Sequence, residues 1–128
     1  MPDLFHDSSL IPASFEGWFE TRGWMIHPHQ VAMVEADRAG RSALLVAPTG
    51  TGKTMAGFLP SLIELSAPDA EDSLHTIYIS PLKALAVDIE RNLAIPIREM
   101  GLDIRAETRT GDTPQAKRSV SAKTRPRC

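Results

Sequence analysis

The spacing of apolar and polar positions divides the chain into helical and extended segments. Helical spacing predicts helices over three segments, residues 28–39, 53–66 and 83–101. Short apolar runs predict three strands, residues 43–47, 74–80 and 104–108. An earlier aromatic segment, containing Phe15, Trp18, Phe19 and Trp24, predicts a short helix and turn. Pro28 and Gly40 suit the first and last positions of one helix, whereas Pro60 should bend the next.

The order of these elements indicates the fold class. A strand–helix–strand–helix–strand succession is typical of βαβ units, whose right-handed crossovers place helices on the faces of a parallel sheet. The run Ala43–Ala47 is apolar throughout, which favours a strand buried on both faces. We therefore expect an α/β fold with a parallel sheet and flanking helices.

The sharpest chemical signal lies between the first predicted strand and the following helix. This segment reads Ala47, Pro48, Thr49, Gly50, Thr51, Gly52, Lys53, Thr54. Its two glycines permit a tight turn that aims backbone N–H groups and a helix N-terminus at phosphate oxygens. Lys53 would reach the β- and γ-phosphates of ATP, and Thr54 would ligate Mg²⁺. Ala47 stands where the general P-loop pattern has glycine, so a plain glycine turn is the alternative interpretation.

Composition and charge exclude some classes of protein and site but do not indicate a function. A hydrophobic content of 42% with 23% charged residues is ordinary for a globular domain, and the net charge of −2 does not indicate nucleic-acid binding. Cys128 is the only cysteine, so no disulfide framework or CxxC metal site can form. No apolar run is long enough to cross a bilayer. We expect a cytoplasmic protein without membrane contact.

Three stretches together resemble the superfamily 2 DEXH-box helicases. APTGTGKT at 47–54 resembles helicase motif I, SPLKALA at 80–86 resembles motif Ia, and RTGDTP at 109–114 resembles the next nucleic-acid-contacting element. The similarity is greatest to the Lhr-like group, specifically its ligase-associated DEXH-box DNA helicases, and covers roughly residues 15–118. It implies a RecA-like P-loop domain, here the incomplete front part of the first motor domain.

The resemblance also implies ligands, partners and site residues. The ligands are ATP with Mg²⁺ and a single-stranded or partly duplex DNA, and a DNA ligase or nuclease in a repair context is an implied partner. Gln30 matches the family's adenine-reading glutamine, with an exposed helix glutamine as the alternative. Contacts with the DNA backbone would come from Pro81, Lys83, Thr110 and Gly111. Lys83 opens a helix, where a cation adds little stability, so a lysine there suits a phosphate contact; a solvated surface lysine is the alternative interpretation.

Other chemistry-bearing residues have structural alternatives. The aromatic residues Phe15, Phe19 and Trp24 could stack on the base, although such a cluster is more often core. His27 and His29 suggest a metal pair, but no third ligand has suitable spacing. Asp112 or Thr113 before Pro114 could be a helix N-cap rather than a DNA contact.

The match is partial, which limits the expected activity. The chain lacks the acid pair that holds Mg²⁺ and the arginines of a second motor domain, so we expect no ATPase activity from it alone. The predicted organisation is a lead-in at 1–27, a partial ATP-binding domain at 28–118 and a basic tail at 119–128. The tail has no helical or strand pattern, and we expect it to be disordered and to result from a frameshift. A non-catalytic nucleotide-binding module, or an inactive truncated product, is the alternative function.

Overall fold

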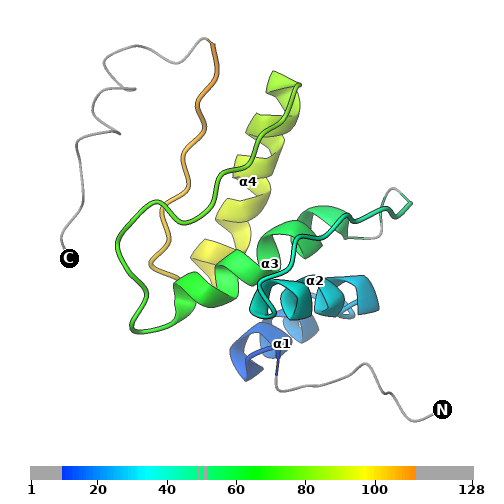
Figure 1. The fold of residues 1–128 in the computed structure, drawn as a ribbon. Coiled ribbons are helices and arrows are strands. Elements are labelled where there is room, and N and C mark those ends of the chain that lie inside the picture. The colour runs from blue at the N-terminus through cyan, green and yellow to red at the C-terminus, as the bar shows by residue number, and fades with distance from the viewer. Residues whose placement is uncertain (1–9, 49, 51, 112–128) are drawn as a thin grey trace. The chain divides into compact units, whose positions relative to one another are not determined.

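The computed structural model describes residues 10–48, 50 and 52–111 of the 128-residue chain (Figure 1). These residues contain four helices: α1 (Ala13–Thr21), α2 (Pro28–Arg38), α3 (Lys53–Ser66) and α4 (Lys83–Glu99). The chain divides into two compact units, Met1–Ala67 and Pro68–Cys128. Thr49, Thr51 and the predictions for residues 112–128, including the capping residues and the basic tail, lie outside the described residues.

The predicted helices are confirmed, and their ends follow from local sequence. Pro28 stands at the first position of α2, where its missing N–H is not needed. Gly40 follows α2 with φ +67°, and Gly101 follows α4 with φ +63°. Beyond α2, the Arg41 N–H donates to the Ala36 carbonyl oxygen at 2.9 Å. This Schellman-type ending needs a left-handed residue, which glycine adopts without steric cost.

The first unit buries aromatic and aliphatic side chains from its three helices. Helix α2 packs against α3, and the centre of the core includes Val34 of α2 and Leu59 of α3, which are 2% and 0% exposed. Phe15 and Phe19 of α1 are 1% and 2% exposed. These two rings are therefore core residues and have no face available for a nucleobase. Trp24, which follows α1, is half exposed and packs edge-on against Trp18.

The predicted sheet is not confirmed. No strand occurs among residues 10–48, 50 and 52–111, and the segments 43–47, 74–80 and 104–108 lie outside regular secondary structure. The expected burial of the first segment is wrong, because Leu44 and Val46 are 89% and 84% exposed. An extended segment becomes a strand only when another backbone satisfies its N–H and C=O groups, and apolar spacing carries no information about that partner.

The second unit is organised around α4. Ser80 precedes this helix, and its Oγ accepts a hydrogen bond from the Leu82 N–H at 3.3 Å. The predicted apolar stripe of α4 is only partly covered, because Ile89, Leu93 and Ile97 are half-buried and Pro96 alone in this helix is buried. Over the described residues, no helix combines the length and apolar character needed to cross a membrane.

Candidate nucleotide-binding site

The P-loop segment turns directly into the start of α3. Gly50 and Gly52 have φ of +82° and +77°, a left-handed conformation that other residues rarely adopt. Gly52 is the N-cap of α3, and no side chain of the described residues caps this helix start. The first N–H groups of any α-helix lack acceptors within the helix and carry its positive dipole end. The turn therefore ends in backbone donors suited to an anion, with Lys53 and Thr54 exposed in the first turn.

Gln30 connects the start of α2 with this turn. Its side chain is buried, with 2% of the residue exposed, so the interpretation as an exposed helix glutamine is wrong. Its Oε1 accepts a hydrogen bond from the His27 N–H at 2.8 Å. Its Nε2 donates to the Gly52 carbonyl oxygen at 3.3 Å. One amide side chain thus holds the N-terminus of α2 against the second glycine of the P-loop segment.

A larger residue at position 52 would have to displace the Gln30 amide. A Cβ atom built on Gly52 would lie 2.6 Å from Gln30 Nε2 and 3.7 Å from His27 Cδ2. Glycine is therefore favoured at position 52 for two reasons: the backbone there is left-handed, and the Gln30 amide lies close to where a Cβ atom would be. Gln30 retains one donor hydrogen on Nε2 and one lone pair on Oε1, because each atom can make two hydrogen bonds.

Two histidines flank this corner at the start of α2. His27 is the N-cap of α2, and its ring stacks on that of His29 with centroids 5.3 Å apart and an interplanar angle of 16°. His29 Nε2 is shielded from solvent, and no described residue is its hydrogen-bond partner. Within the described part of the chain, no group of three or more His, Cys, Asp or Glu side chains could hold a metal ion.

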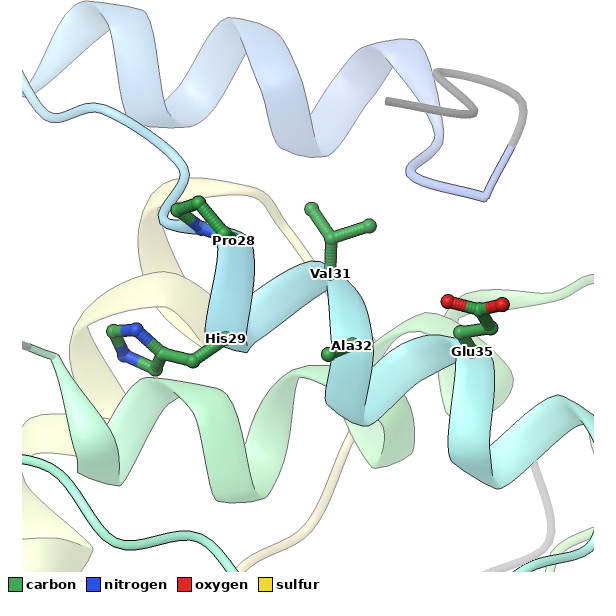
Figure 2. A pocket seen from close by; sticks show the side chains of 5 residues that line it. All are labelled: Pro28, His29, Val31, Ala32 and Glu35. Atoms are coloured by element: carbon green, nitrogen blue, oxygen red, sulfur yellow. The ribbon is translucent and has the colours of Figure 1, made fainter. Parts of the chain in front are cut away.

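A hollow of about 280 Å³ lies along α2 beside the histidine pair. Figure 2 shows the five residues that line it, Pro28, His29, Val31, Ala32 and Glu35. Its floor is mainly apolar, with an imidazole and a carboxylate as the polar groups. Sequence reasoning missed this feature, although the spacing of Pro28, Ala32 and Glu35 places them on one helical face.

The residues expected to contact DNA lie in the second unit. Lys83 is the first residue of α4, as its sequence context predicted, and it is exposed next to the exposed Pro81. Thr110 is half-buried, and Gly111 is exposed at the end of the described residues. Lys83 thus stands at a helix N-terminus, where N–H donors and an ammonium group can meet one phosphate.

Comparison with known proteins identifies the family. The DEAD/DEAH box helicase model matches residues 27–127, which include Gln30, the P-loop segment and Lys83. The chain belongs to the DEAD/DEAH box helicase family. Within this family its relatives include Lhr-type helicases, in agreement with the Lhr-like resemblance seen in the sequence.

Three relatives illustrate the similarity. The chain is 48% identical to the ATP-dependent helicase Lhr-Core of Methanothermobacter thermautotrophicus over 68% of its own length. It is 38% identical to the Lhr helicase/uracil glycosylase of Escherichia coli over 93% of its length, and 42% identical to the Lhr helicase/probable uracil glycosylase of Mycolicibacterium smegmatis over 79%. The chain spans only 12%, 9% and 8% of these relatives, respectively. No solved structure matches it.

Proposed function

We propose that the chain binds ATP with Mg²⁺ and forms the ATP-binding part of an ATP-dependent DNA helicase motor. The observation that carries this proposal is the turn of left-handed Gly50 and Gly52 leading into the uncapped N-terminus of α3. In this proposal the phosphates of ATP sit on the backbone N–H groups of Ala47, Thr49, Gly50, Thr51 and Gly52, while Pro48, which has no N–H, contributes its fixed backbone angle.

The side chains around this turn have distinct roles in the proposal. Lys53 neutralises the β- and γ-phosphates, and Thr54 ligates Mg²⁺ through its hydroxyl. Gln30 reads the adenine edge with the donor and acceptor capacity that its contacts to His27 and Gly52 leave available. Pro81, Lys83, Thr110 and Gly111 contact the sugar–phosphate backbone of single-stranded or partly duplex DNA, where such contacts position a strand without reading its sequence.

In the complete motor we propose that segments 43–47, 74–80 and 104–108 pair into the parallel sheet of a RecA-like fold. Their exposed apolar residues, such as Leu44 and Ile77, then become buried between helices. A cytoplasmic location and a role beside a DNA ligase or nuclease in repair are part of the same proposal.

The P-loop assignment is tested with Lys53→Ala and a matched control. Removing the ammonium group abolishes measurable ATP·Mg²⁺ binding, because losing charge-assisted hydrogen bonds weakens binding by about 10- to 100-fold. Arg98→Ala removes one exposed positive charge from α4 and leaves binding unchanged. Calorimetric titration of both variants measures the effect. Equal ATP affinity in the wild type and in Lys53→Ala would exclude the assignment.

The second candidate is a non-catalytic nucleotide-binding module that acts through a partner chain. It is favoured because no Asp in these 128 residues is followed directly by Glu, whereas a helicase motor needs such a pair for Mg²⁺ and the attacking water. Both candidates require the same ATP site, so turnover rather than binding distinguishes them.

A further inference from the structure

Residues 74–80 form an exposed apolar stretch in the second unit. Leu74, Ile77 and Ile79 are 81%, 70% and 85% exposed. Figure 1 shows the segment as a trace, drawn neither as a helix nor as an arrow, that leads into α4. Successive side chains of an extended chain point to opposite sides, so Leu74 and Ile77 make both sides of the segment apolar.

The composition of this segment is typical of sequences that pair with copies of themselves. Its seven residues include no Asp, Glu, Lys or Arg, no Pro and no Gly, and Thr76–Ile79 consists of β-branched and aromatic residues. Six- or seven-residue segments of high β-propensity and low charge, without proline, are the signature of strand pairing between chains.

The other two extended segments lack this character. Segment 43–47 has alanine at both ends and is followed directly by Pro48. Segment 104–108 contains two charged residues, Arg105 and Glu107, which form an ion pair. Residues 74–80 are therefore the extended segment best suited to pair with another chain.

The backbone of this segment also has an open edge. Ile77 and Ile79 make no backbone hydrogen bond to another described residue. In an extended chain the N–H and C=O groups of residues two apart point to the same edge. An open strand edge of this kind is a template for a strand from another molecule.

We propose that residues 74–80 pair antiparallel with the same residues of a second copy, with Ile77 opposite Ile77, and so form a symmetric dimer. The flanking charges favour this direction. Glu71 precedes the segment, Lys83 follows it, and both are exposed. Antiparallel pairing centred on Ile77 places Glu71 of each copy opposite Lys83 of the other, whereas parallel in-register pairing places like charges side by side.

This dimer does not depend on ATP binding. It uses the segment that the complete motor is proposed to place in its own sheet, so dimer and sheet exclude one another. Two seven-residue strands bury much less surface than a standard protein interface of about 1,600 Å², so we expect a weak dimer with a Kd of about 10–100 µM.

The test measures the oligomeric state of the full chain by sedimentation velocity between about 1 µM and 1 mM. The wild type shifts from monomer to dimer over this range. Ile77→Lys places two like charges opposite each other and removes two apolar contacts, so it raises the Kd at least about tenfold. Leu44→Lys adds the same charge at an exposed position of the first unit and leaves the Kd unchanged. Circular dichroism checks that both variants keep their helix content.

Two cysteine variants measure the register, in a Cys128→Ser background that removes the only native thiol. The two copies of residue 77 have Cα atoms about 5.5 Å apart in a hydrogen-bonded pair, within the range of about 4.4–6.8 Å for a disulfide. The two copies of residue 79 lie about 14 Å apart, because they are four residues away from each other along the strands. Mild oxidation therefore cross-links Ile77→Cys into a dimer and leaves Ile79→Cys monomeric.

Charge reversal tests the direction without changing the apolar segment. Glu71→Lys weakens the dimer, because a lysine then faces Lys83, and the double variant Glu71→Lys/Lys83→Glu restores it. A parallel dimer would be equally stable in Glu71→Lys and in the wild type, and would cross-link through both cysteines.

Several results would overturn this inference. They are a wild type that stays monomeric at about 1 mM, a dimer that persists in Ile77→Lys or is lost in Leu44→Lys, and assemblies that grow beyond two copies, since an isologous contact closes at two. Ile77→Lys binds ATP·Mg²⁺ as the wild type does, so a failure of the dimer leaves the proposed ATP site standing. Loss of ATP binding in the wild type would equally leave the dimer standing.

Discussion

At the scale of single residues, the corner between α2 and α3 is held by the hydrogen bond between the Gln30 side chain and the Gly52 carbonyl. The sequence predicted the glycine from its place in the P-loop pattern and the glutamine from a family resemblance. It did not predict that the glutamine amide donates to the glycine carbonyl, because the two residues are 22 positions apart. In the structure His27 and Gln30 form a capping box at the start of α2, a structural role that the sequence analysis did not assign to them.

Gly52→Ala should weaken both the fold and the nucleotide site. Alanine at position 52 would have to keep the left-handed backbone, which costs about 1–2 kcal/mol of folding free energy. Its Cβ atom would also lie 2.6 Å from Gln30 Nε2. Displacing that buried amide adds about 1–3 kcal/mol, so we expect a total loss of about 2–5 kcal/mol. Urea unfolding followed by tryptophan fluorescence measures it, since Trp18 and Trp24 are the only two tryptophans and belong to the same unit as Gly52.

Gly17→Ala is the matched control for this substitution. Gly17 lies within α1, has no positive φ, and a Cβ there would meet nothing within 4 Å. Alanine at such a helical position stabilises by about 0.5–1 kcal/mol. If Gly52→Ala behaved like Gly17→Ala, the close approach of Gln30 to the P-loop segment would be disproved.

At the scale of elements, the four helices were predictable and the sheet was not confirmed. Helices satisfy their backbone groups locally, so the apolar spacing, Pro28 and the glycines Gly40 and Gly101 sufficed to place them. The extended segments need hydrogen-bond partners that are distant in sequence. Among the described residues, no two segments pair their backbones into a β-ladder. The hollow was likewise unpredictable, because it depends on which face of α2 remains uncovered.

A pair of leucine substitutions tests this difference between elements. Leu59 of α3 is 0% exposed, so Leu59→Ala should lower the free energy of unfolding by about 2–5 kcal/mol. Leu44 is 89% exposed, so Leu44→Ala should change it by no more than about 0.5 kcal/mol. The same urea titration compares both variants. A loss at Leu44 as large as that at Leu59 would show that segment 43–47 is a buried strand in this chain after all.

At the scale of the whole molecule, nucleotide binding and nucleotide hydrolysis depend on different parts of a helicase motor. The proposed binding uses the turn at Gly50 and Gly52, Lys53 and Thr54, which lie within one unit of this chain. Hydrolysis further needs a carboxylate pair for Mg²⁺ and water, and arginines from a second motor domain. In the 128 residues no Asp is followed directly by Glu, and they are too few for two motor domains.

We therefore predict that this chain alone binds ATP without turning it over. Loss of the arginine contribution by itself lowers the rate of phosphoryl transfer by about 10³- to 10⁵-fold, which places turnover below detection. The measurement is phosphate release from ATP·Mg²⁺ with and without single-stranded DNA, at protein concentrations where calorimetry shows the site occupied. Lys53→Ala, purified in parallel, identifies any contaminating ATPase, because a contaminant releases phosphate equally in both preparations. DNA-stimulated release that occurs in the wild type and disappears in Lys53→Ala would contradict the prediction, since it would require a complete set of catalytic groups within these 128 residues.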